Sequence, residues 1–328
     1  MSESGDLIES GGPHVSLARK RPASRGHFRI GLVQERWHPD PDEHEAALAA
    51  GIRRAAGQGA QLVCLQELTL SRYFAVDPGG PKAAGAEPED LPGGPTFRFA
   101  AKLAAETGVH VHASLYERAE DEHVDGLGYN TAIVVAPGGE LIARTRKLHI
   151  PVTAGYHEDR YFRPGPGGGN PYPLVGVADA RLGLPTCWDQ WFPEVARAYS
   201  LEGADVLIYP TAIGSEPEHP EFDTQPLWEQ VIVGNAISNG VFMVAVNRIG
   251  EEPPLRFYGS SFVCDPYGRK LVQAPRDEPA VLVAELDLDQ RHDWLELFPF
   301  LDTRRPDAYR RLSEDPAHDA QRSERTGA

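Results

Sequence analysis

Short apolar runs rich in β-branched residues alternate with stretches of helical periodicity along most of the chain, and this alternation restricts the possible folds more than any other feature. The predicted strands occupy residues 28–34, 61–66, 109–115, 205–209 and 241–246. The predicted helices occupy residues 42–56, 96–107, 194–201 and 227–238. Strands that alternate with helices pack into layers, with helices covering the faces of a sheet. The sequence therefore predicts an α/β fold.

Two more strand pairs are joined by turns rich in proline and glycine. Residues 131–135 precede 140–146 across one such turn, and residues 258–264 precede 270–273 across another. Each half of the chain therefore has a similar layout, and no linker-like segment separates the halves. This organisation predicts one domain over residues 27–312.

Four segments lack periodicity. Residues 1–26 and 313–328 mix Ser, Gly, Pro and charged residues, which predicts a disordered N-terminal tail and a polar C-terminal tail. Two internal stretches, about 74–95 and 210–226, are rich in Pro, Gly and acidic residues. Long loops in compact domains are often functional, so we expect both internal stretches at the rim of a pocket.

Composition limits the partners of the chain. With 328 residues, of which 41% are hydrophobic and 24% charged, the protein has enough apolar surface for a full core. The formal net charge of -16 argues against nucleic acid or an anionic membrane as partner and favours a neutral or cationic small molecule. The sequence shows no membrane-spanning apolar run and no signal-peptide pattern at its start, so we expect a cytoplasmic protein.

The three cysteines are few and widely spaced, which indicates reduced thiols rather than a disulfide framework. Cys64 and Cys264 lie in apolar strand patterns and are expected in the core. Cys187 lies where an apolar stretch meets a turn before a helix that opens at Pro193. A sulfur at such a corner would face helix amide groups that favour the thiolate. A single cysteine is more often a buried small hydrophobe, so its surroundings must decide.

Two ionisable residues occupy positions that match the needs of a sulfur nucleophile. Such a nucleophile needs a base for its proton and a cation for the oxyanion that it creates. Glu67 ends the strand predicted over 61–66, and Lys147 ends the strand predicted over 140–146. The ends of parallel strands are where α/β sheets gather their ligands, although a charged residue at a strand end is often only a solvated terminus.

Longer segments around these three residues carry a more specific pattern. They are Leu65-Gln66-Glu67-Leu68, Arg146-Lys147-Leu148-His149-Ile150-Pro151 and Cys187-Trp188-Asp189-Gln190-Trp191-Phe192-Pro193-Glu194. Together they resemble the three signature motifs of the nitrilase superfamily, the carbon-nitrogen hydrolases, in a match that runs from about residue 28 to 310. Within the superfamily the chain is most similar to N-carbamoylputrescine amidases. The segments that carry this second likeness are 155–158, 161–165, 211–217 and 247–250.

The resemblance implies a four-layer α-β-β-α sandwich with four catalytic side chains. Glu67 is the implied base, Lys147 the oxyanion partner, Cys187 the nucleophile and Glu158 a second glutamate that orients the others. The backbone amide of Trp188 is expected to help bind the oxyanion. The implied mechanism requires no metal and no organic cofactor. The resemblance also implies a homodimer or a larger homo-oligomer.

The expected reaction is cleavage of the ureido carbon-nitrogen bond of an N-carbamoyl amine, N-carbamoylputrescine first, to amine, carbon dioxide and ammonia. Relatives that act on N-carbamoyl amino acids place Arg or His just after the cysteine, whereas this chain has Gln190 and Trp191. The resemblance instead puts Glu216 at the amine-binding position. The other implied substrate-binding residues are Tyr73, Tyr156, Trp188, Thr211 and Ala212.

Several alternatives remain open at this stage. Glu216 could belong to a solvated acidic loop. The enzyme could act on a simple carboxamide or an N-carbamoyl amino acid, or the chain could be a catalytically silent scaffold, although a scaffold has no chemical need for all four catalytic side chains. His110 and His112 alternate on one strand face, but without a third ligand they indicate a surface or hydrogen-bonded pair rather than a metal site.

Two residues beside the motifs carry structural expectations. His149 next to Lys147 is expected to support the site rather than to react. Pro185 would remove one hydrogen-bond donor from the strand before Cys187 if that strand is central in its sheet.

Overall fold

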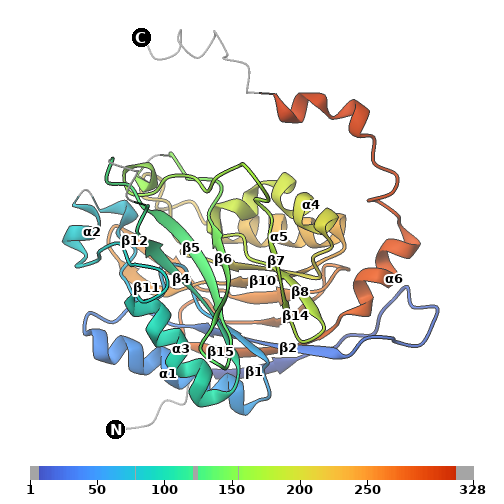
Figure 1. Cartoon of the computed structure of the whole chain (residues 1–328), viewed down its shortest axis with the longest axis horizontal. Helices are drawn as coiled ribbons and strands as arrows, with labels where there is room; N and C mark the ends of the chain where they lie inside the picture. The colour runs from blue at the N-terminus through green and yellow to red at the C-terminus, as the bar shows by residue number, and fades with distance from the viewer. Residues whose placement is uncertain (1–6, 78, 121–124, 154, 315–328) are drawn as a thin grey trace.

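A computed structural model describes residues 7–77, 79–120, 125–153 and 155–314. Two sheets face each other, and Figure 1 shows α1 and α3 on one side of the pair and α4 and α5 on the other. This architecture is the predicted four-layer α-β-β-α sandwich. Between the sheets lies a core of interdigitating apolar side chains, including Leu32, Leu182 and Val244.

The first sheet has seven strands in the order β1-β15-β2-β3-β4-β5-β6. Its strands are β1 (Leu7–Gly11), β2 (His27–Gln34), β3 (Leu62–Cys64), β4 (His110–Glu117), β5 (Tyr129–Val135), β6 (Leu141–Arg146) and β15 (Ala280–Asp287). Helices α1 (Pro41–Gly57) and α3 (Pro95–Thr107) cover its outer face through a second apolar cluster. β2, β3 and β4 run parallel, so their carboxyl ends lie at the same edge.

The second sheet has six strands in the order β14-β13-β10-β9-β8-β7. Its strands are β7 (Leu174–Val177), β8 (Ala180–Gly183), β9 (Val206–Pro210), β10 (Phe242–Val246), β13 (Phe262–Cys264) and β14 (Lys270–Gln273). Helices α4 (Pro193–Glu202) and α5 (Gln225–Asn239) cover its outer face. The remaining described elements include a hairpin of β11 (Ile249–Glu252) and β12 (Leu255–Tyr258), a short α2 (Gly80–Ala83) and α6 (Asp289–Leu297).

One predicted strand differs in an informative way. Residues 258–264 do not form one strand, because Tyr258 ends β12 and Phe262 begins β13. Between them Gly259 and Ser260 have φ values of 51° and 59°, in the left-handed region. A strand cannot pass through two such residues, so the chain turns there and enters the second sheet.

The N-terminal segment is ordered over residues 7–26, contrary to the predicted disordered tail, whose residues 1–6 lie outside the described range. β1 pairs in parallel with β15 and forms one edge of the first sheet. Arg19 contacts Asp287 at 2.8 Å and Asp293 at 2.9 Å, and Arg25 contacts Asp205 at 2.7 Å. These carboxylates lie at least 180 residues away in sequence. Local periodicity therefore gave no sign of what orders the segment.

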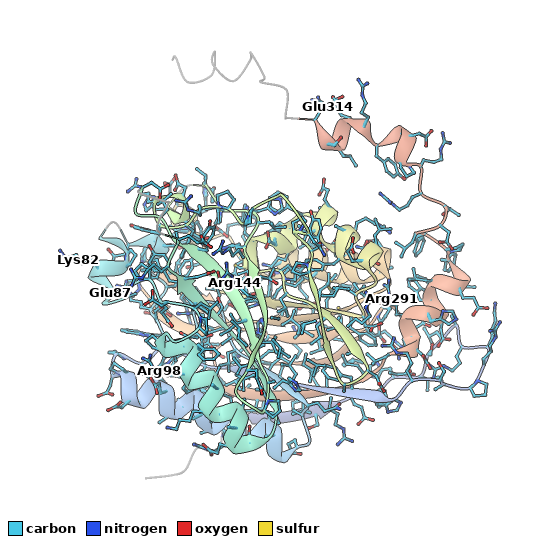
Figure 2. All side chains as sticks on the ribbon, viewed as in Figure 1. Lys82, Glu87, Arg98, Arg144, Arg291 and Glu314 are labelled. Atoms are coloured by element: carbon cyan, nitrogen blue, oxygen red, sulfur yellow. The ribbon has the colours of Figure 1, made fainter. Side chains whose placement is uncertain are left out.

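The C-terminal part of the described chain is anchored at α6. Arg291 on α6 donates to Ser200 Oγ, Ser200 O and the carbonyls of Asn239 and Gly240, which ties α6 to the ends of α4 and α5. Figure 2 labels Arg291 near the sandwich and Glu314 at the far end of the segment that leaves it. The predicted polar tail falls almost entirely outside the described residues. None of the described helices is long and apolar enough to cross a membrane.

Candidate active site

The four predicted catalytic residues come from four separate segments. Glu67 follows β3, Lys147 follows β6, Glu158 begins a 3₁₀ turn over Glu158–Arg160, and Cys187 begins η3 (Cys187–Trp191) after β8. Lys147 Nζ lies 3.0 Å from Glu67 Oε1 and 2.7 Å from Glu158 Oε2. Glu67, Lys147 and Glu158 are at most 1% exposed, whereas Cys187 retains 7%. All four residues are therefore buried, and Cys187 is the most exposed of them.

Cys187 stands on a strained backbone corner. Its φ of +33° lies in the left-handed region, which a residue with a Cβ rarely adopts. β8 ends at Gly183, so Pro185 lies beyond the last paired residue of the strand. The prediction that Pro185 would remove a ladder donor is therefore wrong, because the chain has already left the sheet at that point.

A buried carboxylate, Asp189, joins the turn of Cys187 to the segment of Lys147. Asp189 accepts hydrogen bonds from the Thr186 amide at 3.1 Å, the His149 amide at 2.9 Å and His149 Nδ1 at 2.7 Å. His149 also stacks on Phe192, with 3.7 Å between ring centroids. His149 thus has the structural place expected for it. Asp189 was not among the predicted site residues, although it stands only two positions after Cys187 in the sequence.

The segment of Lys147 is also held by a glycine. The Gly165 amide donates to the Lys147 carbonyl at 2.7 Å. A Cβ at position 165 would lie 2.7 Å from the carbonyl oxygen of Arg146, which is too close for any other residue without a shift of the backbone. The glycine-rich stretch that begins here therefore has a packing role at its first residue.

The ionisation of Cys187 differs from the sequence prediction. Burial raises the pKa of the thiol well above its ordinary value, the charge of Glu67 raises it further, and Lys147 offsets this only in part. The resting sulfur therefore keeps its proton, contrary to the thiolate expected at a helix corner. The nucleophile must be activated by transfer of its proton to a base during attack.

The charges around the sulfur form a compensated cluster. Burial alone would lower the pKa of Lys147, but the carboxylates of Glu158 and Glu67 raise it, so the ammonium stays charged. Burial raises the pKa of Glu158, while Lys147 and a hydrogen bond from Tyr73 act in the opposite direction. The ammonium of Lys147 therefore lies between two carboxyl groups next to the thiol.

The two carboxylate oxygens of Glu67 differ in their hydrogen bonding. Its Oε1 accepts hydrogen bonds from Lys147 at 3.0 Å and from Asn130 Nδ2 at 2.7 Å. Its Oε2 is buried and has no hydrogen-bond partner among the described residues. Glu67 is also the charged group that acts most strongly on Cys187. Oε2 is therefore the oxygen free to accept a proton, and Asn130, which the sequence analysis missed, fixes the other oxygen.

The predicted substrate-binding residues fall into two groups, of which the first supports the catalytic residues. Tyr73 is 1% exposed, and its hydroxyl donates to Glu158 at 2.6 Å, so it orients that carboxylate rather than forming an open wall. The Thr211 carbonyl accepts the Glu67 amide at 3.4 Å. The backbone of Ala212 forms a hydrogen bond that lowers the pKa of Cys187 against the larger effects that raise it.

The second group lies toward solvent. Trp188 is half-buried, with its ring centroid 6.3 Å from that of Trp191. Burial raises the pKa of Tyr156, and the neighbouring Glu216 and Cys187 raise it further, which places Tyr156 near both. Glu216 is half-buried and accepts a hydrogen bond from Thr224 Oγ1 at 3.3 Å. Glu216 therefore belongs to the surroundings of the site and is not a fully solvated loop residue.

The two histidines on β4 lie in different surroundings. His110 Nδ1 lies 3.3 Å from the Gln61 carbonyl. His112 is fully buried, neither ring nitrogen has a hydrogen-bond partner among the described residues, and burial lowers its pKa to about 3. The predicted hydrogen-bonded pair is thus half right. Within the described residues no His, Cys, Asp and Glu side chains gather in a way that could hold a metal ion.

The raised pKa of Cys187 predicts how the thiol reacts with an alkylating agent. Its alkylation by iodoacetamide is expected to accelerate steadily from about pH 7 to about pH 9, because the thiolate fraction keeps growing over that range. Mass spectrometry of the peptides measures the rate, with the fully buried Cys64 and Cys264 as internal controls. A rate that levels off below about pH 8 would show a preformed thiolate and contradict this account.

Comparison with known proteins assigns this fold and site to one class of enzyme, the hydrolases that act on carbon-nitrogen bonds. The family model described as carbon-nitrogen hydrolase matches residues 29–295, and the chain belongs to that family. The ordered N-terminal segment over residues 7–26 lies outside the matched residues.

Individual relatives show how far the similarity extends. An N-carbamoylputrescine amidase from Solanum lycopersicum is 39% identical over 273 residues, which are 80% of this chain and 86% of that protein. A citrullinase from Francisella tularensis is 33% identical over 288 residues, which are 86% of this chain and 97% of that protein. A crystal structure of a carbon-nitrogen hydrolase from Helicobacter pylori G27 is 32% identical, with a TM-score of 0.77, and covers 88% of this chain and 99% of that chain.

Proposed function

We propose that this enzyme hydrolyses the ureido carbon-nitrogen bond of an N-carbamoyl amine through a covalent intermediate on Cys187, with N-carbamoylputrescine as the first candidate substrate. The observation that carries the proposal is the buried ion-pair group of Glu67, Lys147 and Glu158, whose charges act on the thiol of Cys187. Relatives named N-carbamoylputrescine amidase and citrullinase support a ureido substrate.

The first half of the reaction forms the intermediate. Glu67 Oε2 takes the thiol proton of Cys187 while the sulfur attacks the ureido carbon, and a carbonyl oxygen becomes an oxyanion. Lys147 contacts both oxygens of Glu158, so it can turn one donor to the oxyanion and keep the other contact. Trp188 is the second residue of η3, where the amide has no partner within the helix, and its N–H is the second donor.

The second half releases the products. The carbon-nitrogen bond breaks, the proton held by Glu67 passes to the nitrogen, and ammonia leaves. Glu67 then takes a proton from water, which attacks the carbamoyl thioester and restores the thiol. The product is an N-substituted carbamate, which decays to the amine and carbon dioxide. A single carboxylate serves both halves because it accepts a proton from each nucleophile, first the thiol and then water, and returns it to each leaving group, first the nitrogen and then the sulfur.

The substrate proposal rests on Glu216. A half-buried carboxylate whose pKa is raised by burial has lost part of its hydration, and a substrate ammonium would restore its solvation. Tyr156 lies near both Glu216 and Cys187 and could line the path of the methylene chain between them. A substrate with a carbamoyl group at one end and a cation at the other fits this arrangement.

Replacing Glu216 with glutamine is expected to raise KM for N-carbamoylputrescine by about 10- to 100-fold, since a charge-assisted contact contributes roughly 1.5–3 kcal/mol. Turnover of a small carboxamide that lacks an amine should not change. Steady-state ammonia release on both substrates measures the difference, with the exposed Glu218→Gln as a matched control in the same loop. An unchanged KM for the diamine derivative would exclude the amine-binding role.

The alternatives are tested by one screen of ammonia release over carbamoylated diamines, carbamoylated amino acids, carboxamides and nitriles. Preference for citrulline or another carbamoylated amino acid would redirect the substrate proposal, because such substrates carry a carboxylate. Absence of any turnover together with a Cys187 that alkylates no faster than Cys64 would favour a silent scaffold. A cytoplasmic location stays a prediction from the sequence, and a role in polyamine synthesis and a homo-oligomeric state stay predictions from the resemblance.

A further inference from the structure

Arg248 is a fully buried arginine that reaches across the sandwich to the base of the active site. It follows β10 of the six-stranded sheet, whereas Glu67 follows β3 of the seven-stranded sheet. Its Nη2 donates to the Glu67 carbonyl at 2.5 Å and to the Leu68 carbonyl at 3.3 Å, and both terminal nitrogens lie 3.3 Å from the Ser71 carbonyl. One guanidinium therefore gathers three carbonyls of the loop that carries the base.

That loop is strained at the residue after the base. Leu68 has a φ of +48°, in the left-handed region that side chains with a Cβ avoid. Such a conformation is unfavourable for a residue with a side chain and persists only where the surroundings fix it. The Leu68 amide donates to Ser114 Oγ at 3.1 Å, and the Leu68 carbonyl accepts from the Ser71 amide at 3.0 Å and from Arg248 at 3.3 Å, so Arg248 is one of the groups that hold this conformation.

The charge of Arg248 is balanced by Glu252, which leads back to the catalytic group. Arg248 Nη1 lies 2.7 Å from Glu252 Oε1, and Glu252 Oε2 accepts the amide of Tyr73 at 2.7 Å. The Tyr73 hydroxyl in turn donates to Glu158. The hydrogen bonds thus close a ring, from Arg248 through Glu252, Tyr73, Glu158, Lys147 and Glu67 back to Arg248.

We propose that Arg248, together with Glu252, is a positioning residue of this enzyme, which holds the strained backbone after β3 so that Glu67 Oε2 faces the thiol of Cys187. Because Glu67 and Glu158 both belong to this ring of hydrogen bonds, the position of one carboxylate depends on the position of the other. A shift of the guanidinium would move the Glu67 backbone directly and Glu158 through Tyr73. The inference rests on the proposed role of Glu67 as base, but it does not depend on which carbamoyl compound or amide is the substrate.

Arg248→Lys tests the proposal because lysine keeps the charge but presents its donors from one point and cannot span three carbonyls and a carboxylate. We expect kcat to fall about 100-fold with KM within about threefold, since small misplacements of a catalytic group cost this much. The factor should be the same on N-carbamoylputrescine and on a simple carboxamide such as propionamide. The control is Arg269→Lys, which alters another i,i+4 pair with a buried carboxylate, Asp265, outside the catalytic group.

A second parent variant, Glu67→Asp, distinguishes a positioning role of Arg248 from a general loss of stability. In the Glu67→Asp variant the carboxylate is already displaced, because aspartate is one methylene shorter than glutamate. Adding Arg248→Lys to this variant should lower kcat by less than about a further fivefold, because the two changes act on one interaction. Thermal unfolding is measured for every variant. If Arg248→Lys does not fold, Glu252→Gln takes its place, with an expected loss in kcat of about tenfold and the same lack of additivity.

The outcomes are distinct. Equal losses in Arg248→Lys and Arg269→Lys, full additivity with Glu67→Asp, or an effect confined to KM or to one substrate would each overturn the positioning role. A wild-type enzyme that hydrolyses propionamide but not N-carbamoylputrescine would refute the proposed substrate. In that case the kcat of Arg248→Lys relative to the kcat of the wild type, measured on propionamide, would still decide the role of Arg248.

Discussion

Cys187→Ser is expected to lower kcat by at least about 10⁴-fold while leaving the fold intact. A serine hydroxyl has a far higher pKa than a thiol, so a carboxylate is too weak a base to deprotonate it. Serine also lacks the polarisable sulfur that makes cysteine a good nucleophile. The side chains are nearly isosteric and the site is only 7% exposed, so we expect little change in the melting temperature. Ammonia release and thermal unfolding of the same preparation measure both quantities.

The matched control is Cys264→Ala, which removes a thiol that is fully buried in the core under α5 and lies outside the catalytic group. It should lose some stability through the cavity that it leaves, about 1–2 kcal/mol, and retain turnover. A Cys187→Ser enzyme with more than about one per cent of wild-type kcat would show that the sulfur is not the nucleophile.

Lys147→Met is expected to abolish turnover and also to destabilise the protein by about 3–5 kcal/mol at neutral pH, because it leaves two buried carboxylates without their cation. Methionine matches the length of the lysine stem, so the loss would come from charge and not from a cavity. The exposed Lys102→Met serves as control and should change neither quantity measurably.

The pH dependence of this loss of stability follows from the direction in which the pKa of Glu158 shifts. Without Lys147, the pKa of Glu158 in the folded state would rise beyond the raised value that burial already gives it. A group with a raised folded-state pKa favours folding at low pH and loses that contribution as the pH rises through it. The variant should therefore recover part of its stability at about pH 5 relative to about pH 8 in chemical unfolding. Equal destabilisation at both values would mean that the two carboxylates are not coupled through Lys147.

Much of the fold was predictable because it depends on local periodicity. The helices α1, α3, α4 and α5 begin and end within about two residues of their predicted bounds, since their amphipathic patterns and flanking Pro or Gly residues are local signals. The short edge strands β7 and β1 were missed, because four or five residues with mixed burial carry too little pattern. The segment over 258–264 was misread, because its apolar run hides two left-handed residues.

The four proposed catalytic residues were also available from sequence, since each stands in a motif next to a strand end or a turn. The residues that form hydrogen bonds with these four residues and with their segments were not predictable in this way. Asp189, Asn130 and Arg248 act on residues 40 to 181 positions away, and nothing in the local sequence shows which distant group a buried polar side chain meets. Tyr73 was predicted to bind the substrate, but its hydroxyl donates a hydrogen bond to Glu158.

The sequence by itself determined the layered α/β fold, the candidates for nucleophile, base and cation, and the net negative charge of the chain. Only the tertiary structure decided the protonation state of Cys187, the order of residues 7–26 and the ring that holds Glu67 in place. The reason is physical. Periodicity and turn chemistry act between neighbours along the chain, whereas burial, electrostatic fields and ion pairs depend on distances in space that exist only once the chain has folded.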